Sequence, residues 1–344
     1  MKTKIFKIQI LSALMLILFI ANISNAQDNK NLLTKANIES IINDAYNKFK
    51  DVTDGKNADY IPALAEVDSK VFGIALVTAD GQVFTKGDLD TKVSIQSVSK
   101  VFTLALVIEE KGAQIIQDSV GVDATGQVFN SIVAVEQMRG KEINPLVNPG
   151  AIATTSMVEG DTYDAKWNKI LQIHSDFAGR QLDVNEPVYK SEAETNQRNQ
   201  AIAHLLYAYG RMYADPVMST DIYTKQCAIN VNAKDLGMMA ATLSNGGVNP
   251  VTKKKVVTPQ TVEHVLPVMV TAGLYDDSGI WVYNAGNPAK SGVGGGLICV
   301  VPGEFGIAVI SPPLDAAGNS VKGQLVIKYV IDQLKANSYL INPK

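Results

Sequence analysis

The chain has 344 residues, of which 46% are hydrophobic, and a formal net charge of −3. This length is enough for one large domain or for two closely packed ones. A mildly acidic chain without a basic run is poorly suited to nucleic acid or to an anionic membrane surface, so neither is expected as a partner. The sequence has no low-complexity tract and no internal repeat, so a repeat architecture is not expected.

The first 26 residues have the pattern of a secretory signal peptide. Three lysines precede an almost wholly apolar run at residues 8–20, and Ser24-Asn25-Ala26 offers small residues where a signal peptidase reads them. The alternative, a transmembrane anchor, is disfavoured because the apolar run is short for a span. We therefore expect cleavage after Ala26, export to the periplasm or the medium, and no membrane contact of the mature domain at residues 27–344.

Hydrophobic periodicity predicts strands towards both ends of the mature chain and helices in its middle. The expected elements, in chain order, are a helix at 32–50, strands at 71–77 and 82–85, a helix that begins near Ser97, helices at 166–178, 192–212, 233–244 and 259–272, strands at 280–283, 295–301 and 305–310, and a helix at 320–336. Hairpin-type connections indicate an antiparallel sheet. The predicted fold class is α/β, with an antiparallel sheet sandwiched by helices from about 30–95 and 250–344, and a mainly helical lobe at about 96–249.

Ser97-Val98-Ser99-Lys100 opens a strongly apolar helix. A serine and a lysine three residues apart share one face of a helix. The electropositive helix start and burial both favour a neutral Lys100 amine, which can then take the proton of Ser97. The alternative is an exposed serine and lysine, because Ser-x-x-Lys also arises by chance. The apolar face that follows favours a buried pair in the cleft between sheet and lobe.

Lys290-Ser291-Gly292 precedes a glycine-rich turn at residues 293–296 and is the second candidate site. In penicillin-recognising enzymes, Lys-Ser/Thr-Gly on an edge strand is the companion of Ser-x-x-Lys, and both line the cleft. Small residues there let a substrate approach the backbone. The alternative is a plain turn before the strand at 297–301.

The two cysteines, Cys227 and Cys299, are expected to be buried free thiols, although an exported protein could join them. The three histidines, His174, His204 and His264, lack metal-ligand spacing. No metal and no cofactor are therefore expected.

Several separated blocks make the chain similar to the bacterial-type glutaminases, which have the serine β-lactamase fold. The similarity covers about residues 35–337. The blocks are Ile95-Gln96-Ser97-Val98-Ser99-Lys100-Val101-Phe102, Asn144-Pro145-Leu146-Val147-Asn148, Ser191-Glu192, Arg198-Asn199, Tyr223 with Gln226-Cys227, Gly273-Leu274-Tyr275-Asp276, and Pro288-Ala289-Lys290-Ser291-Gly292-Val293-Gly294-Gly295-Gly296. Each block alone is weak, but their common order is specific.

The resemblance implies hydrolysis of L-glutamine to L-glutamate and ammonia by a homodimer or homotetramer. It implies Ser97 as the nucleophile, Lys100 as its base, and an oxyanion hole formed by the backbone N–H groups of Ser97 and Val293. The chemistry of an amide substrate adds a proton relay by Lys100 and Tyr223. The positions that match substrate contacts are Asn148, Glu192, Asn199, Tyr223 and Tyr275.

Structural interpretations of these residues stay open. Asn148 could shape a turn, Glu192 could be a first-turn helix charge, and Asn199 could be a polar residue on a helix face. Both tyrosines could be packing aromatics, and Lys290 could pair with carboxylates of the cleft.

The competing functions are a β-lactamase or D-Ala-D-Ala peptidase, and a non-catalytic ligand-binding protein. The first class carries Ser-x-Asn or Tyr-x-Asn between its two motifs, and this chain has neither tripeptide. A sensor should have lost part of the catalytic set, whereas every part is present here.

Overall fold

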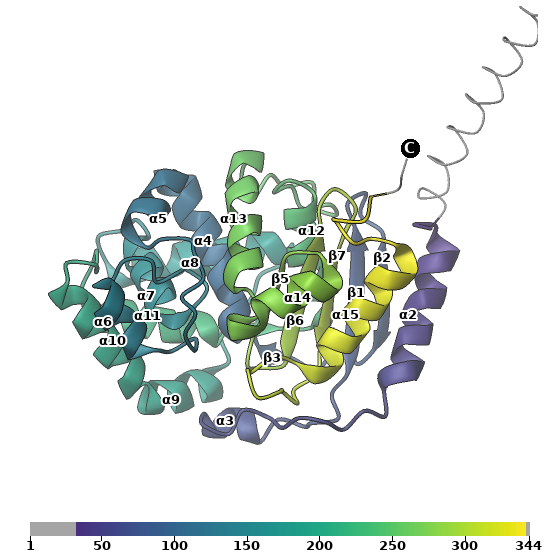
Figure 1. Cartoon of the computed structure of the whole chain (residues 1–344), viewed down its shortest axis with the longest axis horizontal. Coiled ribbons are helices and arrows are strands. Elements are labelled where there is room, and N and C mark those ends of the chain that lie inside the picture. Colours follow the sequence, from purple (N-terminus) through teal and green to yellow (C-terminus); the bar gives the residue numbers. More distant parts are fainter. Residues whose placement is uncertain (1–31, 342–344) are drawn as a thin grey trace, which may run out of the picture.

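The computed structural model describes residues 32–341, so the expected signal peptide at residues 1–26 lies outside the described range. The molecule combines a five-stranded antiparallel sheet with a mainly helical lobe (Figure 1). The strands of the sheet are β1 (Gly73–Thr78), β2 (Val83–Gly87), β5 (Ala289–Ser291), β6 (Gly296–Val301) and β7 (Phe305–Ile310). Their spatial order is β2-β1-β7-β6-β5, and every pair is antiparallel. The predicted α/β fold class is confirmed.

Two short strands and many helices complete the described chain. The strands β3 (Val93–Ser94) and β4 (Asn230–Val231) pair with each other just before the candidate nucleophile. The helices are α2 (Lys35–Phe49), α3 (Pro62–Ala65), η1 (Gln96–Val98), α4 (Ser99–Lys111), α5 (Ala113–Ser119), α6 (Ile132–Met138), α7 (Asn148–Met157), α8 (Tyr163–Ala178), α9 (Glu186–Thr195), α10 (Gln197–Ala208), α11 (Pro216–Cys227), α12 (Ala233–Ser244), α13 (Pro259–Ala272), η2 (Tyr275–Asp277), α14 (Ser278–Ala285) and α15 (Val321–Leu334).

The two faces of the sheet face different cores because side chains alternate along a strand. In β1, Ile74 and Leu76 pack in the core that α2 and α15 cover, whereas Ala75 belongs to the core shared with the lobe. Helix α12 packs on β1, β6 and β7. This helix falls within the expected helical lobe at about 96–249 and also packs on α8, so it joins the lobe to the sheet.

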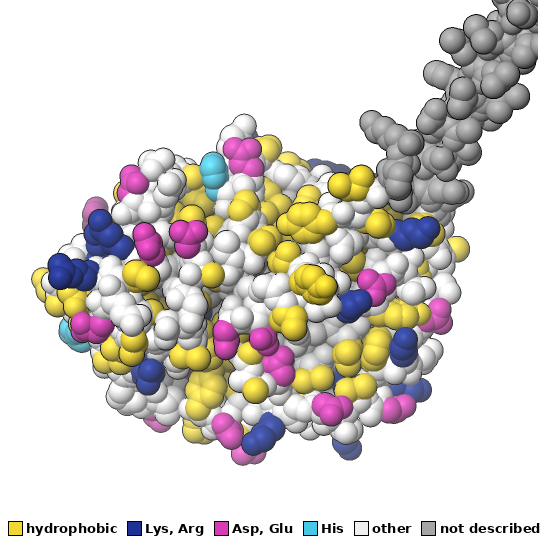
Figure 2. Space-filling view, viewed as in Figure 1, with side chains coloured by type: hydrophobic (Ala, Val, Ile, Leu, Met, Phe, Trp, Pro, Cys, Tyr) yellow, Lys and Arg dark blue, Asp and Glu magenta, His cyan; other side chains and the backbone are white. Residues whose placement is uncertain are grey.

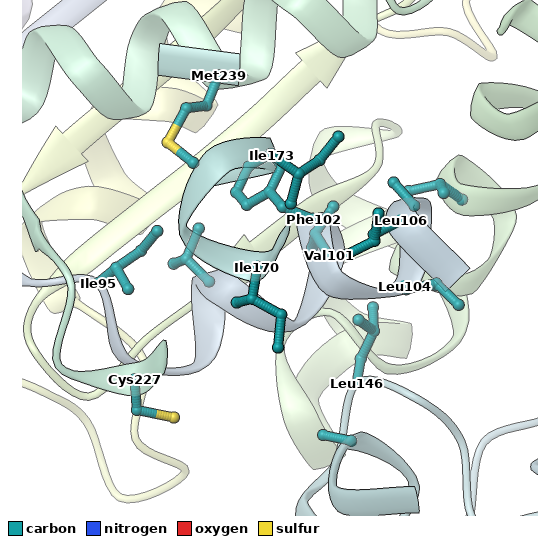
Figure 3. Packing of buried hydrophobic residues seen from close by; sticks show 14 of the residues in the cluster. Ile95, Val101, Phe102, Leu104, Leu106, Leu146, Ile170, Ile173, Cys227 and Met239 are labelled. Carbon is teal, nitrogen blue, oxygen red and sulfur yellow. The ribbon is translucent and has the colours of Figure 1, made fainter. Parts of the chain in front are cut away.

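Helix α4 is the central helix of the lobe. Every residue from Ser99 to Ile108 is buried. Phe102 lies beside α8, and its ring centroid is 4.8 Å from that of Phe177. Figure 3 shows Phe102 together with Ile170 and Ile173 in this core. A helix buried on all sides carries any polar residue in its first turn into the interior, which explains the burial of Lys100.

The strand expected at 280–283 is wrong, because these residues lie in α14. The run of large apolar residues resembled a strand, but burial follows a helical spacing: Trp281 and Ala285 are buried, whereas Ile280 and Tyr283 are exposed. The Trp281 indole donates to the Asn287 carbonyl at 2.9 Å, which fixes the buried face. Hydrophobic side chains gather over this part of the surface in Figure 2.

The single helix expected at 192–212 is also wrong. The chain forms α9 and α10 instead, and Asn196 separates them with φ −91° and ψ 17°. The Asn196 amide donates to Thr224 Oγ1 of α11 at 3.1 Å. A tertiary contact of this kind outweighs the helical periodicity, which continues through the break.

Both cysteines are buried free thiols, as expected. Cys227 lies in the core of the lobe, whereas Cys299 lies in the core under α2 and α15. Within residues 32–341, no helix is long and apolar enough to cross a membrane.

Candidate active site

A cavity of about 280 Å³ lies where the sheet meets the helical lobe. Six residues that the sequence singled out line it, and they come from six different segments of the chain. These residues are Ser97, Asn148, Glu192, Asn199, Tyr223 and Val293. A second cavity of about 800 Å³ adjoins the first, since both are lined by Tyr60, Phe129 and Val293.

Ser97 and Lys100 lie at the start of the buried lobe helix. Ser97 is in η1, and Lys100 follows in the first turn of α4 with only 1% of its surface exposed. The Lys100 amine donates to Asn148 Oδ1 at 2.7 Å. Burial lowers the pKa of Lys100 to about 8, and the charge of Glu192 opposes this shift. A large share of neutral amine at mildly alkaline pH is what a general base requires.

The turn after β5 approaches the backbone of Ser97 closely. A Cβ atom on Gly292 would lie 3.3 Å from the Ser97 nitrogen and 2.8 Å from the Ile95 carbonyl oxygen. Within residues 32–341, neither the Ser97 N–H nor the Val293 N–H donates to a protein acceptor. Two free N–H groups on adjacent segments can stabilise an oxyanion. The expectation of Lys290-Ser291 on an edge strand is also met, because β5 is the last strand of the sheet.

Asn148 connects the candidate base with two other predicted residues. It is the first residue of α7, and its Oδ1 also accepts from the Tyr223 hydroxyl at 3.2 Å. Its Nδ2 donates to Asn199 Oδ1 at 3.0 Å. Burial raises the pKa of Tyr223 well above its usual value, so its hydroxyl stays protonated and can donate. Asn148 therefore links several candidate site residues by hydrogen bonds and does more than shape a turn.

Glu192 is a buried carboxylate in the second half of α9, only 7% exposed. The alternative interpretation as a first-turn helix charge is therefore wrong. Burial raises the pKa of Glu192 to about 7, while a hydrogen bond from Gln96 and the charge of Lys100 oppose the rise. The Gln96 amide donates to Glu192 Oε2 at 3.2 Å. A buried carboxylate on a cavity wall is suited to bind a cationic group.

Gln96 and Tyr60 are two of the lining residues to which the sequence assigned no role. Gln96 has φ +49°, a left-handed conformation that is uncommon outside glycine, and this conformation directs the chain into Ser97. Tyr60 lies on the segment before α3 and lines both cavities. Gln96 lies in the sequence block around Ser97, but nothing in that block indicated what its side chain would contact. Tyr60 had no sequence signal, because it is far from the motifs along the chain.

Tyr275, Lys290 and Ser291 lie behind the cavity wall. The Tyr275 hydroxyl donates to the Ser291 carbonyl at 3.2 Å. Burial raises the pKa of Tyr275, and its neighbour Ser97 acts in the opposite direction. Lys290 donates to main-chain carbonyls and has no carboxylate partner within residues 32–341, so the expected alternative pairing is not observed. Across the same residues, no cluster of three or more His, Cys, Asp or Glu side chains could hold a metal ion.

The antiparallel sheet, the helical lobe and a buried Ser-x-x-Lys helix between them define an enzyme-like fold of the β-lactamase type.

Comparison with known proteins identifies the family within this fold class. The family model described as Glutaminase matches residues 55–339. A glutaminase of Colwellia psychrerythraea is 53% identical over 302 residues, which is 88% of this chain and 97% of that protein. A glutaminase of Brucella canis is 54% identical over 292 residues, or 85% of this chain and 92% of that protein.

A solved structure described as the probable glutaminase ybaS superposes with a TM-score of 0.88 at 45% identity, covering 89% of this chain and 99% of that one. The chain belongs to the glutaminase family, and its fold is that of the β-lactamase-like glutaminases.

Proposed function

We propose that the protein hydrolyses L-glutamine to L-glutamate and ammonia through an acyl-enzyme on Ser97. Family membership supports the reaction. The observation that carries the mechanism is the cavity itself, because Ser97 opens onto it beside Glu192 and Val293 while Lys100 lies buried behind. The volume of about 280 Å³ suits a small substrate.

Acylation begins with the neutral Lys100 amine. It takes the proton of the Ser97 hydroxyl, and the oxygen attacks the γ-carbonyl carbon of glutamine to form a new C–O bond. The N–H groups of Ser97 and Val293 hold the resulting oxyanion, and the loss of one such donor typically costs about 3 kcal/mol.

Ammonia leaves when the C–N bond breaks. An amide is a poor acyl donor because its nitrogen must be protonated as it departs. The proton now on Lys100 reaches that nitrogen directly or through the Tyr223 hydroxyl, and the link between both groups and Asn148 Oδ1 supports this route. Water then attacks the acyl-enzyme with the same base, which releases glutamate and restores the Ser97 hydroxyl.

The α-substituents of glutamine explain the remaining polar residues. Glu192 pairs with the ammonium group, and the substrate charge favours the ionised form of this carboxyl. The amides of Asn148 and Asn199 bind the carboxylate by hydrogen bonds, and the Tyr275 hydroxyl joins them when it turns away from the Ser291 carbonyl. No cofactor takes part in this scheme.

Ammonia release from glutamine by the purified mature protein tests the reaction, and mass spectrometry of quenched enzyme tests the acyl-enzyme. Wild type should carry a γ-glutamyl adduct on the peptide that contains Ser97, and Ser97→Ala should carry none. Ser99→Ala is the matched control, because it removes a buried hydroxyl two residues away whose partner is Gln226. An adduct that persists in Ser97→Ala would refute the covalent step.

We also propose export with cleavage after Ala26, and self-association of the mature chain as a dimer or tetramer without membrane contact. The sequence of residues 1–26 supports export, and N-terminal sequencing of the secreted or periplasmic protein tests it.

The exposed side chains of Ile280 and Tyr283 support self-association, because adjacent exposed apolar residues favour an interface. A monomer in light scattering at micromolar concentration would refute it.

A further inference from the structure

Lys290 is a fully buried lysine for which the mechanism above has no step. It lies on the edge strand β5 with 0% exposure. Its amine donates to the carbonyl oxygens of Gly273 at 2.9 Å and of Ser291 at 2.6 Å. Burial lowers the pKa of Lys290 well below its usual value, and the charge of Lys100 adds to this effect. A buried lysine is costly to maintain, so its presence needs a reason beyond folding.

The same amine faces the ring of Tyr275. Nζ lies 4.2 Å from the ring centroid, close enough for a cation–π interaction. The Ser291 carbonyl that accepts from Lys290 also accepts from the Tyr275 hydroxyl. Lys290 thus contacts the ring face of Tyr275 and shares the acceptor of its hydroxyl, and the ring contact helps to fix the position of the ring.

The backbone of Tyr275 requires such support. Its φ of +58° is in the left-handed region, which is rare for a bulky residue. A conformation of this kind persists only when the surroundings hold it in place. The Phe129 ring contacts Tyr275 from the lobe, with centroids 4.9 Å apart, and Lys290 contacts it from the sheet.

Removing the Lys290 amine leaves neither carbonyl without a donor. The Gly273 carbonyl still accepts from the Ser291 N–H at 3.1 Å, and the Ser291 carbonyl still accepts from Tyr275. An apolar side chain of similar length would therefore fill the site without a buried unsatisfied group. Replacing buried charge with well-packed apolar atoms is often neutral or stabilising. Stability thus gives no reason to retain a lysine here.

We propose that Lys290 is a positioning residue for the reaction: it holds the Tyr275 ring and the end of β5, and it keeps a donor on the Ser291 carbonyl when the Tyr275 hydroxyl turns from that carbonyl to the substrate carboxylate. This role rests on the proposed function, in which Tyr275 binds that carboxylate. Lys290 itself touches neither the substrate nor the reacting atoms. The role proposed for Lys290 is therefore indirect, unlike that of a cleft lysine that binds a substrate carboxylate itself.

The test is a double-mutant cycle with Lys290→Met and Tyr275→Phe, read by steady-state kinetics on glutamine and by thermal melting. Lys290→Met should raise KM about 10–100-fold, which is the value of a hydrogen bond to a charged group, with a smaller change in kcat. Its melting temperature should equal or exceed that of wild type. In the Tyr275→Phe background, Lys290→Met should raise the KM for glutamine little further, because both substitutions act through the Tyr275 hydroxyl.

Lys322→Met is the matched control. Lys322 is also buried, donates to one main-chain carbonyl, that of Lys50, at 3.0 Å, and faces the ring of Phe72 at 5.1 Å. It lies on α15 and does not line the candidate active site. This variant should keep wild-type kinetics.

Wild-type KM in Lys290→Met, or losses that multiply in the double variant, would overturn the positioning role. So would a fall in melting temperature that accounts for the lost activity. If Lys290→Met does not fold, Lys290→Gln retains a donor for the carbonyls without the cation and should show the same rise in KM. An inactive wild type would reject the proposed function instead, whereas an active wild type with an inactive Ser97→Ala leaves only the role of Lys290 in question.

Discussion

Glu192→Gln separates substrate recognition from a structural role more sharply than any other single change. The substitution keeps the size of the side chain and its capacity to accept a hydrogen bond from Gln96, but it deletes the negative charge. Because Glu192 is only 7% exposed, solvent cannot replace that charge as a partner of the substrate ammonium. Removing one partner of a desolvated ion pair costs about 3–5 kcal/mol. The expected fall in kcat/KM for glutamine is therefore about 10²–10³ or more.

The assay compares glutamine with its des-amino analogue, which has the same amide and carboxylate but no ammonium group. On the analogue, the loss caused by Glu192→Gln should be much smaller, since there is no ion pair to break. Equal losses on the two substrates would refute the assignment of the ammonium to Glu192.

Glu186→Gln is the matched control for this experiment. It deletes the same charge in the first turn of the same helix, where the side chain is exposed. An exposed charge near a helix N-terminus contributes about 0.3–1 kcal/mol to stability. Kinetics on both substrates should stay at the wild-type level.

The remaining predictions concern the base, pH and substrate class. Ser97→Ala and Lys100→Ala should each abolish ammonia release, and the double variant should be no worse than either, because a nucleophile and its base act as a unit. The kcat/KM should rise with pH through the range set by Glu192, with a pKa of about 7, and Lys100, with a pKa of about 8, because Glu192 must be ionised and Lys100 neutral. A pH–rate profile that falls over that range would contradict these roles. Nitrocefin should not be hydrolysed at a rate comparable with glutamine, and spectrophotometry at equal enzyme concentration checks this.

Local patterns predicted much of the fold and of the site. The spacing of Ser97 and Lys100 and the glycines around Val293 each lie within one short segment, so their geometry follows from one helix start and one turn. The antiparallel sheet was also predictable, because short apolar runs joined by tight turns indicate hairpins. In α14 the same reasoning failed, because a run of β-branched and aromatic residues does not reveal whether one face or alternate residues will be buried.

The contacts that tune the site could not be read from the sequence. Gln96 and Glu192 are 96 positions apart, and Lys100 and Asn148 are 48 apart, yet each pair is hydrogen-bonded. Such pairs depend on how two helices pack, not on the preferences of either segment. The burial of Lys290 against Tyr275 belongs to the same class, since it follows from the placing of β5 at the edge of the sheet.

The proposed mechanism couples the two titrating groups of the site, Lys100 and Glu192, to the substrate. Burial pushes both Lys100 and Glu192 towards their neutral forms, which suits a base but not a partner for an ammonium group. An ionised Glu192 also opposes the fall in the pKa of Lys100. In the proposed mechanism, the substrate ammonium pairs with Glu192, which favours the ionised carboxyl and at the same time cancels the charge that Lys100 experiences. On this proposal, binding of the correct substrate makes the lysine a more available base, and a ligand without the α-amino group lacks this effect. Recognition and activation would then be two consequences of one ion pair.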